Sequence, residues 1–273
     1  MKRFWAQSYL WLLLGLLYAP ILIIAIFSFT EAKVLGNWTG FSTQLYTSLF
    51  SGGVSGSLVR AIENTALIAV IASILSTALG TMAAIGIFNL HGRKRQTINF
   101  LNNIPMLNPD IITGISLFVL FVALGVSQGY VTVIIAHVTF CIPYVVLSIM
   151  PKLHQMDANT YEAALDLGAT PWQALRKVII PEIRPGIISG LILAFTLSID
   201  DFAVTLFTKG NEGLDTISTY IYADARKGGL TPELRSLSTI IFVVVLVLLV
   251  IINIRSKKNK SIKKTRYFND LRS

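Results

Sequence analysis

The chain has 273 residues, of which 53% are hydrophobic and only 14% are charged, and its formal net charge is +9 at pH 7. Soluble domains carry about 25% charged residues, so this composition excludes an ordinary soluble domain and favours a membrane protein. The basic residues lie in short polar segments between long apolar runs, which argues against nucleic-acid binding as the origin of the charge.

Apolar runs long enough to cross a membrane recur along the chain. In hydrocarbon a helix satisfies its own backbone, and the alternating ten-residue segments typical of a barrel are absent from the sequence. We therefore predict an all-α polytopic membrane protein, one domain with six transmembrane helices, at Tyr9–Phe29, Asn64–Phe88, Pro109–Leu124, Tyr130–Met150, Gly186–Phe207 and Leu237–Ile254.

The first run follows Lys2 and Arg3, as in a secretory signal peptide. It is about 20 residues long, however, and no small-x-small cleavage site follows it, so we interpret it as an uncleaved first span. After the second span we expect a short cytoplasmic loop at His91–Gln96. The sequence Asn108-Pro109-Asp110 then has the features of a helix start: a cap, Pro at the first helical position, and an acid near the positive end of the dipole.

The polar segment between the fourth and fifth spans, residues 157–181, is called here the EAA loop after Glu162-Ala163-Ala164. Asn159 stands three residues before Glu162, the spacing of an N-cap residue and an N3 carboxylate. Gly168 suits the left-handed residue that ends a helix. The sequence Thr170-Pro171-x-Gln173 has the cap, Pro and Gln of a second helix start. We predict two short helices joined at a glycine.

Two adjacent carboxylates, Asp200 and Asp201, lie well inside the fifth apolar run. Each costs about 2.5–3.5 kcal/mol at a helix centre on insertion scales, so a partner or a task is expected for it. One of them can face a pore while the other pairs with a neighbouring helix or caps a helix break. A purely structural pair, satisfied by Ser198, Thr205 or a basic residue, also fits the sequence.

The distribution of Lys and Arg predicts the orientation. Most of the 23 basic residues fall on the same side as the N-terminus, including the EAA loop and the basic tail at residues 255–273. Since cytoplasmic loops carry this excess, both termini and the EAA loop are expected in the cytoplasm. The tail is suited to bind anionic membrane lipid.

Other chemistry is sparse. His137, within the fourth span, is expected to be a buried, hydrogen-bonded structural residue, and Cys141 is the single cysteine, which excludes a disulfide framework. The sequence contains no phosphate-binding G-x-x-x-x-G-K-[ST] motif, so no nucleotide site of that kind is expected.

The spacing of Glu162-Ala163-Ala164, Gly168 and Val178-Ile179-Ile180-Pro181 resembles the EAA signature of the membrane-spanning subunits of bacterial ABC importers. Val178 and Ile180 depart from its Ile and Leu but keep the apolar bulk. From about Asn64 to Ile254 the chain is similar to the C-type permeases of spermidine/putrescine importers, through the segments MLNPDIITGISLFVLF, AHVTFCIPYVVLSIMPKL and LILAFTLSIDDFAVTLF.

This resemblance implies the type I permease fold of ABC importers in the bacterial cytoplasmic (inner) membrane. It implies a homologous B-type permease, an ATPase homodimer that binds the ATP, and an extracytoplasmic polyamine-binding protein as partners, with no cofactor on this chain. The implied ATPase-docking residues are Glu162, Ala163, Ala164, Gly168 and Pro181. The expected substrate-pathway residues are Asp200, Asp201 and Asp110, although Asp110 also fits a purely helix-terminal role.

Three alternatives stay open at this stage, one of which is a non-transporting membrane scaffold. Permeases for other organic cations and for ferric iron use sequences related to the SIDDF segment. An ion-coupled secondary transporter, in which Asp200 or Asp201 carries a proton, is a different class; it is disfavoured because no internal repeat is evident and the EAA loop would have no purpose.

Overall fold

The computed structural model describes residues 2–32, 36–50, 55–157, 159–211, 213–227, 231–243 and 246–247, and all regular structure in this part of the chain is helical. The contacts divide the chain into two compact units, where the sequence predicted one domain. One unit takes Met1–Ser55 with Ala223–Ser273, and the other takes Gly56–Tyr222.

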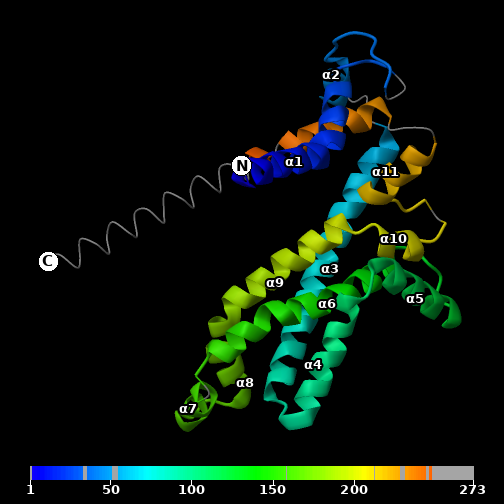
Figure 1. The fold of residues 1–273 in the computed structure, drawn as a ribbon. Coiled ribbons are helices and arrows are strands. Elements are labelled where there is room, and N and C mark those ends of the chain that lie inside the picture. Colours follow the sequence, from blue (N-terminus) through cyan, green and yellow to red (C-terminus); the bar gives the residue numbers. More distant parts are fainter. Residues whose placement is uncertain are drawn as a thin grey trace. The chain divides into compact units, whose positions relative to one another are not determined.

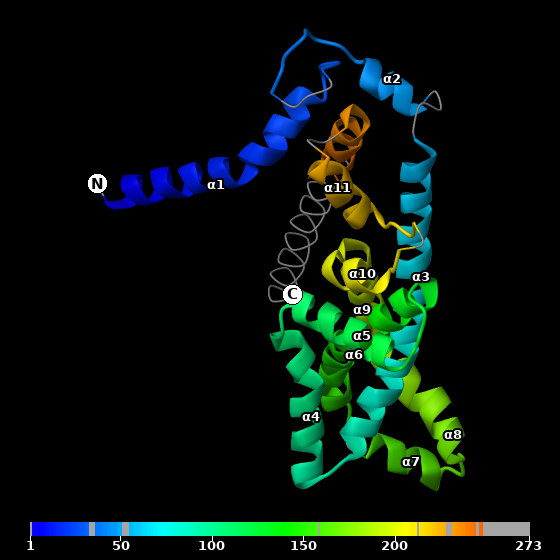
Figure 2. The same ribbon diagram turned by 90° about the vertical axis from the view of Figure 1, so that its right-hand side faces the viewer.

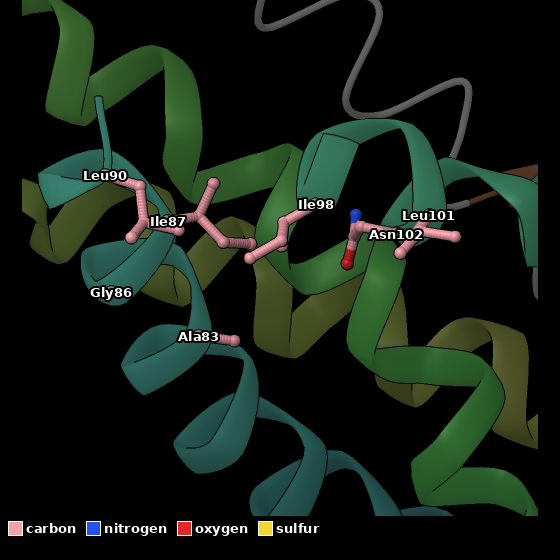
Figure 3. A pocket seen from close by; sticks show the side chains of 7 residues that line it. All are labelled: Ala83, Gly86, Ile87, Leu90, Ile98, Leu101 and Asn102. Atoms are coloured by element: carbon pink, nitrogen blue, oxygen red, sulfur yellow. The ribbon is translucent and has the colours of Figure 1, made fainter. Parts of the chain in front are cut away.

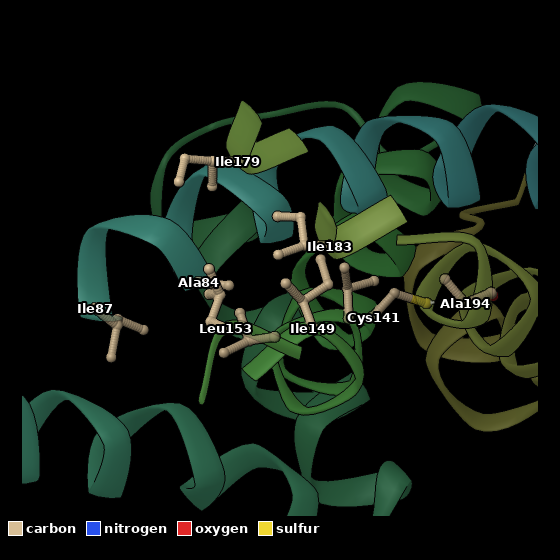
Figure 4. Close-up of a cluster of buried hydrophobic side chains, with 10 residues drawn as sticks. Ala84, Ile87, Cys141, Ile149, Leu153, Ile179, Ile183 and Ala194 are labelled. Carbon is tan, nitrogen blue, oxygen red and sulfur yellow. Dashed lines mark hydrogen bonds between the residues drawn. The ribbon is translucent and has the colours of Figure 1, made fainter. Parts of the chain in front are cut away.

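The larger unit is built on three long helices, α3 (Gly56–Asn89), α6 (Tyr130–Gln155) and α9 (Ile180–Asp200), which pack against one another (Figure 1). Their shared core is a cluster of aliphatic side chains and Cys141, shown in Figure 4: Ala84, Ile87, Cys141, Val145, Val146, Ile149, Leu153, Ile179, Ile183 and Ala194.

Glycines let these helices approach closely. A Cβ on Gly80 of α3 would lie 2.7 Å from Val145 Cγ1, and one on Gly186 of α9 would lie 3.1 Å from the Ser148 carbonyl oxygen. Small residues serve this purpose between helices in a membrane, where van der Waals packing and not the hydrophobic effect holds helices together.

Two helices of this unit, α4 (Gly92–Leu107) and α5 (Asp110–Ala123), form a pair bent by 105° (Figure 2). The short loop predicted at His91–Gln96 is therefore incorrect, because Gly92 begins a helix of 16 residues. Pro109, which lacks an N–H, stands at the bend and occupies the N-cap position of α5 instead of its first helical position.

The fifth predicted span, Gly186–Phe207, is not one continuous helix. In the structure α9 ends at Asp200, and a short helix, α10 (Ala203–Thr208), follows after a break. The EAA loop between α6 and α9 contains α7 (Thr160–Asp166), α8 (Pro171–Ala174) and a π-helical turn, η1 (Leu175–Ile179), and α11 (Ile217–Arg226) follows α10 in the chain.

The smaller unit contains α1 (Lys2–Phe27), α2 (Gln44–Phe50) and a helix over residues 232–243. Arg235 is fully buried there and donates from Nη1 to the Ala32 carbonyl oxygen at 2.8 Å. Most of the predicted span Leu237–Ile254, beyond residues 237–243 and 246–247, and the whole basic tail at 255–273 lie outside the described residues.

Within the described residues, four helical stretches are long and apolar enough to cross a membrane: Gln7–Phe27, Gly56–Asn89, Tyr130–Gln155 and Pro171–Asp200. The bent pair of α4 and α5 makes five if it counts as one span. The last stretch is notable because it runs from the EAA loop through α9 to Asp200.

Candidate functional site

The first helix of the EAA loop, α7, begins as predicted but is capped differently. Asn159 occupies the N-cap position, yet its side chain makes no capping hydrogen bond. The Asp157 carboxylate accepts from the Asn159 backbone N–H at 2.9 Å, just before the helix begins. Glu162 lies in the first turn, where a carboxylate is favourable near the positive end of the helix dipole.

The end of α7 confirms the prediction for Gly168. Its φ is +85°, in the left-handed region. The Gly168 N–H donates to the Leu165 carbonyl at 2.9 Å, and the Ala169 N–H donates to the Ala164 carbonyl at 3.1 Å. This pair of bonds is the Schellman arrangement, which closes a helix and turns the chain sharply.

The second helix start is also confirmed. Thr170 Oγ1 accepts from the Gln173 N–H at 3.3 Å, and Gln173 Oε1 accepts from the Thr170 N–H at 3.0 Å. Pro171 stands at the first helical position, where its missing N–H costs nothing. The loop backbone is therefore fixed by its own side chains.

The loop continues into α9 through η1. In this π-helical turn the Ile180 N–H donates to the Leu175 carbonyl, five residues earlier. Pro181 follows and cannot donate to the carbonyl four residues earlier, so a local change of hydrogen-bond register is expected at this point. Because the helical path remains unbroken, the EAA loop and Asp200 stand at the two ends of one helical rod, Pro171–Asp200.

The surface of the loop exposes two large apolar side chains among its polar ones. Leu167 is 89% exposed and Trp172 is 66% exposed, whereas Ala164 and Ala174 are buried. The small alanines let the two short helices pack together, and the large side chains project away from this chain. Such exposed apolar side chains on a rigid turn are typical of a contact with another protein.

A cavity of about 720 Å³ lies beneath this surface. Phe88 and Arg95 line one part of it, and Tyr161, Glu162 and Trp172 of the EAA loop line another. The Arg95 guanidinium lies over the Phe88 ring, 5.2 Å from its centroid. Of the predicted docking residues, Glu162 therefore lies at this cavity, while Ala163 and Gly168 are exposed on the loop.

A second hollow, of about 620 Å³, lies between the end of α3 and α4 (Figure 3). Its lining is aliphatic except for Asn102, and comprises Ala83, Gly86, Ile87, Leu90, Ile98, Leu101 and Asn102. With a single polar side chain in its lining, this groove has little to orient a polar ligand.

The break between α9 and α10 separates the two adjacent acids. Asp200 is the last residue of α9 and is exposed, whereas Asp201 is 9% exposed and has an extended backbone (φ −65°, ψ 133°). Asp201 Oδ1 accepts from the Val204 N–H at 3.2 Å, and Oδ2 accepts from the Thr205 N–H at 2.8 Å. Asp201 thus satisfies the first turn of α10, as an N-capping carboxylate does.

The neighbouring helix α6 completes this polar cluster. His137 is fully buried; its Nδ1 lies 2.6 Å from Ser198 Oγ, its Nε2 lies 2.9 Å from Thr205 Oγ1, and Nε2 is 3.3 Å from Asp201 Oδ2. The prediction of a buried, hydrogen-bonded histidine is confirmed. Its pairing with Asp201, 64 positions along the chain, was not foreseen.

Asp110 is the exposed first residue of α5. Helix α5 packs directly on α10, the helix that follows Asp200 and Asp201 in the chain. The structure therefore keeps all three acids near helix ends, while only Asp201 is enclosed by protein groups.

Comparison with known proteins gives a consistent result. Residues 76–256 match the family described as "Binding-protein-dependent transport system inner membrane component". The chain is 35% identical over 260 residues, 95% of its length and 99% of the relative's, to the "Spermidine/putrescine transport system permease protein PotC" of Haemophilus influenzae. It is 38% identical over 244 residues to the "Putrescine transport system permease protein PotI" of Escherichia coli, covering 86% and 85% of the two chains.

Solved structures share the fold at low sequence identity. A chain of a bacterial ABC transporter involved in the import of the acidic polysaccharide alginate superposes with a TM-score of 0.64 at 15% identity, covering 94% of this chain and 95% of that one. A chain of the MetNI methionine ABC transporter, in an inward-facing conformation, gives 0.58 at 19% identity, covering 72% and 92%.

Proposed function

Because the chain belongs to the family of binding-protein-dependent transport system inner membrane components, we propose that it is the C-type permease subunit of an ATP-driven polyamine importer. One observation carries the proposal: an exposed carboxylate, Asp200, stands at a helix break in a chain 35% identical to a spermidine/putrescine permease over 95% of its length. Carboxylates in a pathway favour a cationic substrate.

In this proposal the three acids have different tasks. Asp200 and Asp110 are exposed at helix ends and contact the ammonium groups of the substrate. Asp201 belongs to the predicted pathway set, but its oxygens are already engaged by Val204, Thr205 and His137. We therefore assign Asp201 to holding the break, and direct contact to the other two acids.

The EAA loop is the proposed docking site for an ATPase homodimer, which binds and hydrolyses the ATP; this chain performs no covalent chemistry. Leu167 and Trp172 supply exposed apolar surface, and Glu162 supplies a charge at the adjoining cavity. Pro181 and η1 lie where the loop becomes α9, so they join the proposed docking site directly to that helix.

The rod Pro171–Asp200 suggests how the two ends communicate. Thirty helical residues span about 45 Å, more than the thickness of the hydrocarbon core. Movement of the EAA loop on closure of the ATPase dimer would displace the far end of the rod, and with it Asp200, between inward- and outward-facing states.

The proposal includes the wider assembly. It places six spans in the inner membrane with both termini in the cytoplasm, a homologous B-type permease beside this chain, and an extracytoplasmic polyamine-binding protein on the outer side. The apolar helix α1, which has no buried residue in its membrane-length window, supports the membrane location, because such a helix needs lipid or a partner helix around it.

The test is uptake by a reconstituted system. The chain is produced with its ATPase, partner permease and binding protein, and uptake of labelled spermidine and putrescine is measured with ferric iron and another organic cation as competitors. Polyamine uptake that requires ATP, together with copurification of the ATPase, is expected. Uptake of iron but not of polyamine would overturn the substrate class, and uptake without any ATPase would overturn the docking role.

A further inference from the structure

The break between α9 and α10 is bridged by a residue from a third helix. The His137 ring of α6 is fully buried and contacts Ser198 in the last turn of α9 on one side. On its other side it contacts Thr205 in the first turn of α10. One imidazole therefore holds both helix ends that flank Asp201.

The donors and acceptors that each side chain carries fix the direction of each hydrogen bond. The Thr205 hydroxyl donates its single proton to Asp201 Oδ2 at 2.7 Å, so its contact with His137 requires an N–H on Nε2. In a neutral ring Nδ1 then accepts from the Ser198 hydroxyl. The bonds run in one direction, from Ser198 through His137 and Thr205 to Asp201, and every member has a partner.

This arrangement requires the break. In a continuous helix the Val204 and Thr205 amides would donate to carbonyls four residues earlier, whereas here they donate to the Asp201 carboxylate. Buried polar groups are costly unless they are paired, so the cluster is satisfied only when α9 ends at Asp200.

We propose that His137 is a positioning residue of the substrate pathway: by bridging Ser198 and Thr205 it holds the α9–α10 break in one geometry and so fixes the direction of Asp200. The pathway role of Asp200 rests on the proposed function. The bridging by His137 rests on the geometry alone, and the two can be tested separately.

The single cysteine makes the test direct. Cys141 is buried, and its replacement by alanine gives a thiol-free chain into which Asp200→Cys is introduced. The rate at which a cationic methanethiosulfonate reagent modifies this thiol in the assembled transporter then reports the direction of position 200. His137→Phe should change the rate by about fivefold or more, because it removes both bridging contacts in a buried site.

Two further variants separate bridging from folding. His137→Gln retains a donor near the position of Nε2 and should keep the rate within about twofold of the parent. Thr139→Val alters an exposed residue of the same helix, whose hydroxyl donates to the Ile135 carbonyl, and should leave the rate unchanged. If His137→Phe does not assemble, two other variants replace it. Ser198→Ala removes the contact of His137 with α9, and Thr205→Val removes its contact with α10 together with the hydroxyl's bond to Asp201; each should shift the rate.

The outcomes distinguish the two ideas. An unchanged rate of thiol modification in His137→Phe, or in both Ser198→Ala and Thr205→Val, overturns the bridging role, whatever the effect on uptake. If these variants are then less thermally stable, the cluster has a structural role alone. Normal polyamine uptake by Asp200→Asn would instead refute the pathway role of Asp200, and a shifted labelling rate would still support the bridge.

Discussion

The EAA loop and the α9–α10 break are both interruptions of helical structure, but their polar and apolar groups are arranged in opposite ways. In the loop, the Gly168 turn and the Thr170 capping box satisfy the backbone locally, and Leu167 and Trp172 are left exposed. At the break, apolar packing encloses the polar side chains, and the Asp201 carboxylate finds its partners inside the protein.

This difference between the two regions indicates two different roles. A rigid turn that exposes large apolar side chains is complete only when another surface covers them. A buried, fully paired polar cluster needs nothing from outside and serves to specify one local geometry. The same helical rod, Pro171–Asp200, joins the two regions.

The largest effect is expected from a charge on the exposed apolar surface of the loop. Leu167→Asp should reduce uptake to background and abolish copurification of the ATPase, because a buried unpaired charge opposes docking. Thermal stability in detergent should change by less than about 0.5 kcal/mol, since Leu167 is 89% exposed in this chain. Leu167→Met is the matched control and should transport normally. Normal ATPase binding by Leu167→Asp would contradict the docking surface.

The two adjacent acids should respond in opposite ways. Asp201→Asn should lower the free energy of unfolding by about 1–3 kcal/mol, because it weakens charge-assisted bonds to buried amides and to the Thr205 hydroxyl. Asp200→Asn should leave stability within about 0.5 kcal/mol, because the side chain is exposed, yet reduce uptake strongly.

Thermal denaturation and uptake, measured on both variants at matched expression, check this contrast. In both, the affinity of the separate binding protein for substrate should stay constant. If Asp200→Asn were the unstable variant and Asp201→Asn the stable one, our assignment of roles would be reversed.

A smaller effect is expected at the turn between α7 and α8. Gly168 has a φ of +85°, and nothing lies within 4 Å of the position of an added Cβ, so a substitution there acts through the backbone and not through a clash. Gly168→Val should cost about 1–2 kcal/mol and weaken ATPase copurification severalfold. Gly168→Asn, which adopts the left-handed conformation more readily, is the control and should retain most binding. Equal binding by all three proteins would show that the turn does not shape the docking surface.

Local signals predicted the EAA loop well. The left-handed Gly168 and the reciprocal bonds of Thr170 and Gln173 follow from short-range stereochemistry, which the sequence expresses directly. The N-cap position at Asn159 was placed correctly, but its side-chain bond was not. Asn159 has a helical backbone (φ −86°, ψ −6°) instead of the extended one that lets a side chain reach the N2 or N3 amide. Most apolar runs likewise became long helices.

Long-range features were harder to predict. Hydropathy cannot reveal that α9 ends at Asp200, because Phe202–Phe207 is as apolar as the residues before it. The break depends on His137, whose partnership with Asp201 links distant parts of the chain and carries no local signature. The helix α4 was not predicted because it has no buried residue and so no clear apolar face in the sequence. Its polar first turn, at Arg93–Arg95, resembles a loop.

The smallest effect is expected from the capping box that starts α8. Thr170→Ala removes the oxygen that accepts from the Gln173 N–H, and loss of such a cap costs about 1 kcal/mol. Helix α8 has only four residues and begins the helical stretch that leads to α9. The loss of its cap should therefore cause local fraying of the EAA loop. ATPase binding should weaken by about fivefold or less, and hydrogen exchange should rise at the Gln173 amide. Thr170→Ser keeps the oxygen and should restore both. If Thr170→Ala bound the ATPase as weakly as Leu167→Asp, the local backbone would contribute as much to docking as the exposed side chains do, and the contrast between the two regions would fail.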